Sequence, residues 1–166
     1  QCGTTGNDNW CLDTADLNLS ASEPQGFYLS INGELNSLPF SCPAGNANCT
    51  RNLAEGTGTA SFWAVSAAGV SNIGIASWKL DSVPPAIAPT LPTINGANGW
   101  YLNDILADLG ASDITSGLAS TGISVSGNPT QPAPITLSDG IHILDFLADD
   151  FAGHRTSTQR TVSVDS

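Results

Sequence analysis

The chain carries one sequence pattern twice. The segment Gly6–Trp10 matches Gly96–Trp100, which lies 90 positions later. Further along, Leu53–Gly56 matches Leu137–Gly140, which lies 84 positions later. A pattern that recurs with turn residues and apolar residues in the same places predicts two copies of one fold. The spacing falls from 90 to 84, so the first copy is expected to carry an insertion of about six residues in its middle.

The stretch Trp78–Pro85 marks the boundary between the copies. It combines an alternating strand with two prolines, and Val162–Ser166 repeats the strand and its Asp-Ser ending. The segment Pro84–Pro92 is rich in proline, which keeps a chain stiff and extended. We therefore predict domains at residues 1–82 and 83–166, joined by a short semi-rigid link. The sequence stops at Asp165–Ser166, where the boundary pattern would continue with two prolines. This suggests that the chain is a piece of a longer array of repeats, or a subunit that polymerises end to end.

Short alternating segments run through both copies. Leu17–Ala21 places apolar residues at every second position, as do Ala60–Ser66 and Leu144–Asp150, and this period predicts strands with one buried face. Gly26–Ile31 alternates in the same way and leads to Asn32–Gly33, a pair that predicts a tight turn. The chain contains 17 Gly and 10 Pro, which favour turns between such strands. It is therefore predicted to be all-β, with two tandem immunoglobulin-like β-sandwich domains.

All four cysteines lie in the first copy, at Cys2, Cys11, Cys42 and Cys49. Their spacing fits no Cys-x-x-Cys metal or redox motif, and an even number in loops favours disulfides and an oxidising compartment. Four cysteines allow three pairings. The interval that contains Cys42 and Cys49 coincides with the insertion, and an insertion closed on itself is the simplest arrangement. We therefore predict the pairs Cys42–Cys49 and Cys2–Cys11.

Three motifs stand out in the second copy: Asp113–Leu118, Pro134–His142 and Ala148–His154. Together with the close at Val164–Ser166, they resemble the immunoglobulin-like repeat domains of large bacterial surface and secreted proteins. The resemblance implies an extracellular structural protein whose repeats act as a stalk, spacer, adhesin segment or filament subunit. Its partners would be neighbouring repeats or identical subunits. One departure is His154, where members of this family usually carry asparagine.

Charge and composition argue against several classes of function. Fifteen acidic residues against four basic ones give a net charge of −11, which repels phosphate backbones, so we expect no nucleic-acid partner. No apolar run reaches the ~18–20 residues that a membrane helix needs. A hydrolase triad needs a histidine beside a serine and a carboxylate. His142 lies in an alternating segment and His154 in a turn, so we expect no enzymatic activity.

Three aspartates are candidate calcium ligands: Asp81, Asp113 and Asp150. Calcium takes six to eight oxygen ligands, and in arrays of sandwich domains such oxygens often gather near domain junctions. The alternative for Asp150 is structural, because a carboxylate at a turn accepts hydrogen bonds from nearby amides such as those of Ala152 and Gly153. Apart from calcium, no cofactor is expected.

Trp63 is the candidate binding residue. It alternates with Phe62 and Ala64, so it faces outward if Phe62 lies in the core. An exposed tryptophan suits a glycan or a surface protein as partner, which makes a ligand-binding module of a larger secreted protein or enzyme the alternative function. Two glycosylation sequons start at Asn18 and Asn48, and their use depends on the organism.

Overall fold

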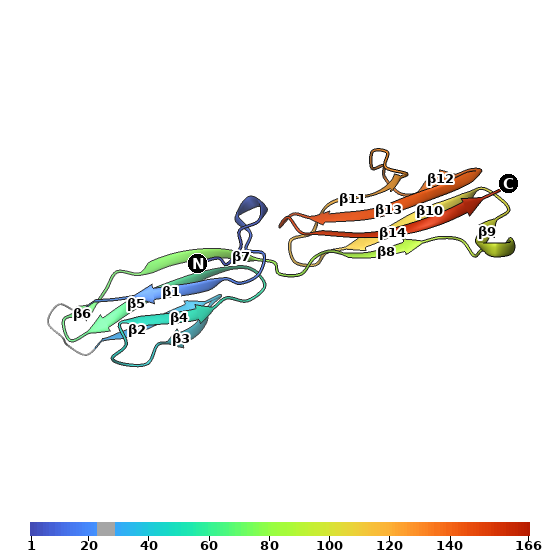
Figure 1. Ribbon diagram of the computed structural model, residues 1–166. Helices are drawn as coiled ribbons and strands as arrows, with labels where there is room; N and C mark the ends of the chain where they lie inside the picture. Colours follow the sequence, from blue (N-terminus) through green and yellow to red (C-terminus); the bar gives the residue numbers. More distant parts are fainter. Residues whose placement is uncertain (23–28) are drawn as a thin grey trace. The chain divides into compact units, whose positions relative to one another are not determined.

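The computed structural model describes residues 1–22 and 29–166 as an all-β chain (Figure 1). The chain divides into two compact units, unit 1 at Gln1–Ser82 and unit 2 at Val83–Ser166. The strand that the sequence predicts at Gly26–Ile31 falls partly on residues 23–28, which lie outside the described residues.

Unit 1 holds two sheets around one core. Its strands are β1 (Asp16–Ser20), β2 (Ser30–Leu35), β3 (Leu38–Ser41), β4 (Asn48–Asn52), β5 (Gly56–Ser66), β6 (Gly69–Val70) and β7 (Gly74–Leu80), preceded by a short 3-10 turn η1 (Asn7–Asn9). β1 pairs with β4, while β3, β2, β5 and β6 form the other sheet and β7 also pairs with β5. Side chains from both sheets meet in the buried core: Cys11, Ala15, Leu17, Leu19, Ile31, Cys42, Ala60, Trp78 and Leu80.

Unit 2 has the same two-sheet design. Its elements are β8 (Ala86–Thr90), the 3-10 turn η2 (Ala97–Gly99), β9 (Trp100–Tyr101), β10 (Ile105–Ser112), β11 (Leu118–Val125), β12 (Ile135–Leu137), β13 (Gly140–Asp150) and β14 (Arg155–Val164). One sheet has the order β12-β10-β8 and the other β11-β13-β14-β9. Both contribute to the buried core: Tyr101, Ile105, Ala107, Ile123, Leu137, Leu144, Phe146, Val162 and Val164.

The sequence repeat is also a repeat of strand register. In unit 1, β5 and β7 pair from Gly56↔Leu80 onward, and in unit 2, β13 and β14 pair from Gly140↔Val164 onward, so the same alignment recurs 84 positions later. The turns η1 and η2 occupy matching places, each followed by a tryptophan. A shared register requires the same alternation of inward and outward side chains, because a slip by one residue would invert every face.

The middle of unit 1 differs from the sequence expectation. The predicted turn at Asn32–Gly33 is wrong, because β2 continues through these residues and the chain turns at Asn36 and Ser37, whose φ angles are 47° and 66°. Gly33 serves close packing instead. A Cβ atom there would lie 2.4 Å from the Ser61 carbonyl oxygen and 2.6 Å from the Phe40 ring. Glycine is therefore required at position 33 for packing against residues distant in the sequence, and not for a turn.

The disulfides in the structure join Cys2 to Cys11 and Cys42 to Cys49, with Cα atoms 5.5 and 6.0 Å apart. The second one closes the segment between β3 and β4, which belongs to the longer middle of unit 1. Disulfides are typical of proteins from oxidising compartments. Among the described residues, no helix has the length and apolar character needed to cross a membrane.

Candidate functional site

Trp63 lies on the outer face of the β3-β2-β5 sheet, opposite the side that carries Phe62. It stands across from Asn32 of β2 and is half-buried, where the sequence predicted an exposed ring. The surface around it is hollowed by about 370 Å³. We call this the Trp63 hollow. Its lining residues are Asn32, Gly33, Glu34, Pro39, Phe40, Ser41 and Trp63.

The Trp63 hollow combines an aromatic ring with polar groups. Asn32 donates a hydrogen bond from Nδ2 to Ser30 Oγ at 3.2 Å, which orients its amide, and Glu34 is exposed in the next outward position of β2. A ring with an amide and a carboxylate beside it suits a ligand that has both apolar faces and hydroxyl groups. Alternation of residues points to Trp63, but Asn32, Glu34 and Ser41 could not be selected without knowing the register between strands.

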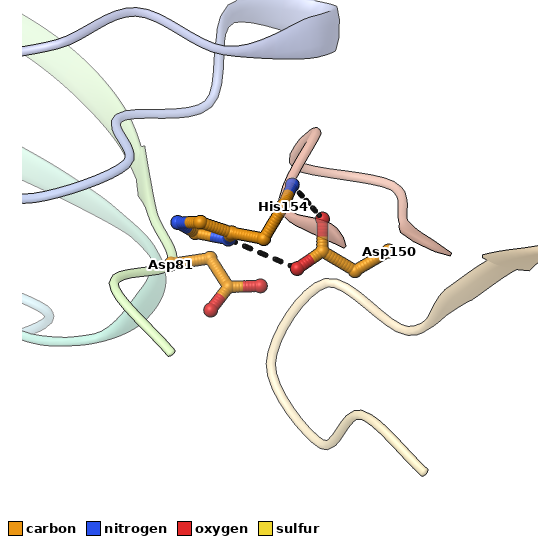
Figure 2. Close-up of side chains that lie close together, drawn as sticks. All are labelled: Asp81, Asp150 and His154. Carbon is orange, nitrogen blue, oxygen red and sulfur yellow. Dashed lines mark hydrogen bonds and ion pairs between the residues drawn. The ribbon is translucent and has the colours of Figure 1, made fainter. Parts of the chain in front are cut away.

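Asp150 ends β13 and is almost fully buried. Its Oδ1 atom accepts hydrogen bonds from the backbone N–H groups of Gly153 at 2.6 Å and His154 at 2.8 Å. Its Oδ2 atom lies 2.9 Å from His154 Nδ1 (Figure 2). The expected hydrogen bond from the Gly153 amide is therefore present, whereas the Ala152 amide donates to Ser116 Oγ instead. Asp150 organises the turn between β13 and β14.

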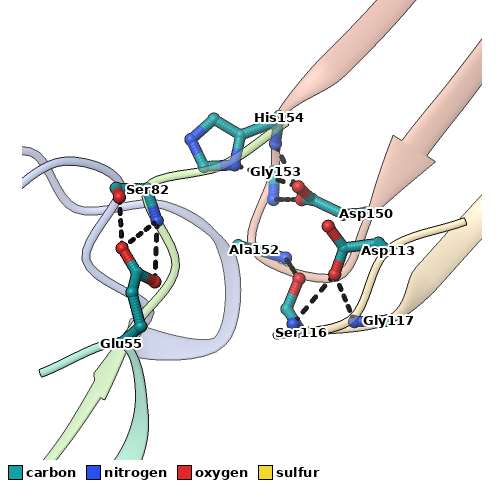
Figure 3. A network of polar contacts seen from close by, with 9 residues as sticks. All are labelled: Glu55, Ser82, Asp113, Ser116, Gly117, Asp150, Ala152, Gly153 and His154. Atoms are coloured by element: carbon teal, nitrogen blue, oxygen red, sulfur yellow. Dashed lines mark hydrogen bonds and ion pairs between the residues drawn. The ribbon is translucent and has the colours of Figure 1, made fainter. Parts of the chain in front are cut away.

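Asp113 has the same role in the neighbouring loop between β10 and β11. Its Oδ1 atom accepts from the N–H groups of Ser116 at 3.0 Å and Gly117 at 2.8 Å (Figure 3). The two loops are joined, because Ala152 N–H donates to Ser116 Oγ at 3.2 Å and Phe151 N–H to the Gly117 carbonyl at 2.9 Å. Asp113 and Asp150 therefore lie at the same end of unit 2.

The repeated Asp-Ser ending has a structural explanation. In unit 1 the Ser82 N–H donates to Glu55 Oε2 at 3.2 Å, and the Ser82 hydroxyl donates to the same carboxylate (Figure 3). In unit 2 the Ser166 N–H and hydroxyl both donate to Asp139 Oδ1 at 2.7 Å. The Ser166 bonds lower the pKa of Asp139, the backbone one most. Asp81 directly precedes Ser82 in unit 1. It is buried, and its backbone N–H donates to the Cys11 carbonyl at 2.9 Å.

Other carboxylates are held as anions by local donors. The pKa of Asp13 is lowered chiefly by the Thr4 N–H, which donates to Oδ1 at 2.8 Å. The pKa of Asp149 is lowered chiefly by the Arg155 guanidinium, whose Nε and Nη2 atoms lie 2.6 and 3.0 Å from the two carboxylate oxygens. Asp149 and Asp150 face opposite sides of β13. Asp149 therefore forms an ion pair with Arg155 on the outer side, whereas Asp150 is buried in the turn.

The remaining sequence candidates take part in local contacts. His142 Nε2 lies 2.8 Å from the Ser138 carbonyl oxygen, which places this histidine in a backbone contact of unit 2. Asn18 is exposed, accepts from Thr50 Oγ1 at 2.8 Å and donates to Gln1 Oε1 at 3.1 Å. Asn48 is exposed at the start of β4. The use of both sequons stays open.

The calcium assignment to Asp81, Asp113 and Asp150 stays a prediction. It predicts that millimolar calcium raises the melting temperature of the chain and that a chelator reverses the rise, because a ligand that binds only the folded state stabilises it. Asp113→Asn should abolish the rise while keeping an acceptor for the loop amides. Asp108→Asn, at an exposed position of β10, is the matched control. An unchanged melting temperature with either addition contradicts the assignment.

Comparison with known proteins assigns no family. No protein-family model matches the chain, and no curated protein matches it. Among solved structures, it is similar to the fibronectin(III)-like modules of Clostridium thermocellum CbhA, with a TM-score of 0.41 and 15% sequence identity. The match covers 98% of this chain and 91% of that chain. It is also similar to a 1.5-MDa bacterial ice-binding adhesin, with a TM-score of 0.34 and 14% sequence identity. That match covers 93% of this chain and 59% of that chain.

A further similarity is to Bacteroides ovatus SGBP-B of a mixed-linkage glucan utilization locus, in complex with a mixed-linkage heptasaccharide. The TM-score is 0.33 and the identity 12%, over 99% of this chain and 67% of that chain. All these likenesses are distant.

Proposed function

We propose that the chain is an extracellular structural and adhesive protein without enzymatic activity, in which two tandem immunoglobulin-like domains form a stalk, spacer or filament subunit at the cell surface. The observation that carries the proposal is the repeated register of β5–β7 and β13–β14, which gives each unit its own sheets and core. Modules that close their own cores extend reach by repetition. Pro84 and Pro85 follow unit 1 and restrict the backbone there.

Single-molecule stretching of the oxidised chain tests this proposal. We expect two separate unfolding events, each releasing roughly 3.5 Å of contour per freed residue. Unit 1 should release less, because the segments closed by Cys2–Cys11 and Cys42–Cys49 cannot extend. A reducing agent should lengthen the unit 1 event and leave the unit 2 event unchanged. One combined event, or two events that both respond to reduction, would contradict the tandem arrangement.

The second candidate is a ligand-binding module for a glycan or partner protein, and the Trp63 hollow favours it. On this hypothesis, Trp63→Ala should abolish binding on a glycan array while the melting temperature stays within a few degrees of the parent, because a half-buried outer ring contributes mainly to the ligand. Phe151→Ala, which removes an exposed ring from unit 2, is the control and should bind as the parent does. Binding that persists in Trp63→Ala, or its absence in the parent, counts against a glycan site at this hollow.

A further inference from the structure

Asparagine is followed by glycine at three places in the chain: Asn32–Gly33, Asn95–Gly96 and Asn98–Gly99. Such a pair can lose the side-chain ammonia of asparagine without a catalyst, because glycine has no Cβ atom to keep its backbone nitrogen away from the preceding carboxamide. In a folded chain the carboxamide must be free to turn, and the peptide unit after it must rotate until its nitrogen meets Cγ. The three pairs differ in both respects.

The ladders on both sides of β2 hold Asn32–Gly33 in place. Asn32 pairs with Ser41 of β3 on one side and with Trp63 of β5 on the other. Its carboxamide donates from Nδ2 to Ser30 Oγ at 3.2 Å. Rotation of this peptide unit would break ladder hydrogen bonds of a strand that has a neighbour on each side. The fold therefore protects Asn32.

Hydrogen bonds hold both reacting groups of Asn95–Gly96. The Asn95 Oδ1 atom accepts from the Leu102 N–H at 2.8 Å, which fixes the carboxamide. The Gly96 N–H donates to the Trp100 carbonyl at 2.9 Å, which fixes the nitrogen that would attack. Both bonds have to open before the reaction, and a local opening of this kind is a minor state of the folded chain. The fold therefore protects Asn95 as well.

Asn98–Gly99 lies at the centre of the tight turn η2, and both residues are exposed. Asn98 has φ 54° and ψ 30°, and Gly99 has φ 84°. The Trp100 N–H closes the turn on the Ala97 carbonyl. Positive φ at both central positions is typical of a type I′ turn. Within residues 1–22 and 29–166, no hydrogen bond holds the Asn98 carboxamide.

This turn can bring the two reacting atoms together by rotation of one peptide unit. Rotation between Asn98 and Gly99 gives the type II′ form, in which ψ of the first central residue is about −120° and φ of the second is about −80°. At that ψ the Gly99 nitrogen lies on the side of the Asn98 Cβ atom, within reach of Cγ. Glycine adopts negative and positive φ about equally, and a Cβ atom at position 99 would meet nothing within 4 Å. The closing bond from Trp100 to Ala97 spans the rotating unit and can persist.

We propose that Asn98 is a site of spontaneous modification in the folded chain, where it is converted to aspartate and isoaspartate, and that Asn32 and Asn95 are protected. The Gly99 nitrogen loses its proton and bonds to Asn98 Cγ. The Cγ–Nδ2 bond then breaks, and ammonia leaves with a proton from solvent. Water opens the cyclic imide, giving aspartate by cleavage at Cγ and isoaspartate by cleavage at the backbone carbonyl carbon. The net change is uptake of water and release of ammonia, without an oxidant or a reductant.

Unit 1 shows that aspartate fits this turn. Asp8 matches Asn98 at the spacing of 90 and has φ 47° and ψ 33°. There the Trp10 N–H closes the turn on the Asn7 carbonyl at 2.9 Å. The aspartate product should therefore keep the turn, whereas isoaspartate lengthens the backbone inside it and should loosen the closing bond. Either product carries a carboxylate that is ionised at neutral pH, which adds negative charge to a chain of net charge −11.

The test follows the full chain in a warm, mildly alkaline buffer, because the attacking nitrogen must lose its proton. Mass spectrometry of proteolytic peptides measures conversion at each pair, and enzymatic methylation detects isoaspartate. We expect Asn98 to convert at least about tenfold faster than Asn32 and Asn95, because those two must first break native hydrogen bonds. A matched sample in denaturant lacks the fold and should bring the three rates to within about threefold of one another.

Two variants define the reaction at this turn. Asn98→Gln keeps a carboxamide but moves its carbon one bond farther from the Gly99 nitrogen, so no conversion at position 98 is expected over the same period. Asn98→Asp is the standard for the aspartate product. Its melting temperature should stay within a few degrees of the parent, because Asp8 occupies the same turn in unit 1.

Two results would overturn the proposal. The first is conversion of Asn32 or Asn95 at the same rate as Asn98 in the folded chain. The second is conversion of Asn98 that is at least about tenfold slower in the folded chain than in denaturant, which would show that the turn protects this residue too.

Discussion

Replacing Phe146 by alanine is expected to lower the free energy of unfolding of unit 2 by about 3–5 kcal/mol. The ring is 0% exposed and lies in the core between both sheets, so its removal loses apolar burial and leaves a cavity. Denaturant unfolding monitored by tryptophan fluorescence and circular dichroism measures the change. A loss below about 1 kcal/mol would show that the core tolerates the cavity and would contradict the packing described for Phe146.

Phe62→Ala is the matched control, since Phe62 holds the same position of β5 in unit 1. Its ring is half-buried, so less apolar area is lost and the expected cost is smaller, about 1–3 kcal/mol. Equal losses at the two positions would contradict the difference in covering between the units.

Asp150→Ala is the second substitution with a large expected effect, about 2–4 kcal/mol of unfolding free energy. The carboxylate accepts from the Gly153 and His154 N–H groups while almost fully buried, and alanine leaves both donors without this partner. Asp150→Asn keeps an acceptor oxygen and should cost less than half as much. Denaturant unfolding gives the size of the loss, and faster amide exchange at Gly153 and His154 locates it. Equal losses in Asp150→Ala and Asp150→Asn would mean that charge, not the hydrogen-bond acceptor, stabilises the turn.

Much of the fold follows from sequence pattern alone. The alternation at Leu17–Ala21, Ala60–Ser66 and Leu144–Asp150 predicts strands that the structure contains as β1, β5 and β13. Period-two patterning is reliable there because one face is buried and the other is not. The turn at Asn32–Gly33 failed for the opposite reason. Its signal is local, whereas the requirement for glycine comes from Phe40 and Ser61, which the chain brings close only after folding.

The candidate sites were less accessible to sequence reasoning. Asp113 and Asp150 are prominent as acids, yet their hydrogen bonds to loop amides depend on backbone geometry that composition does not encode. The repeated Asp-Ser ending was visible, but its acceptors Glu55 and Asp139 lie in another part of each copy.

The register of unit 2 also decides how that unit would resist a pull on its two ends. β8 starts beside Ser112, at one end of β10, whereas β14 finishes beside Tyr101, which precedes the other end of β10. A pull on the two ends of the unit therefore acts along the strands. Ladder hydrogen bonds lie across the strands, so such a pull shears many of them together and does not open them one after another. Peeling would require traction across the sheet, a direction in which the ends of this unit do not pull.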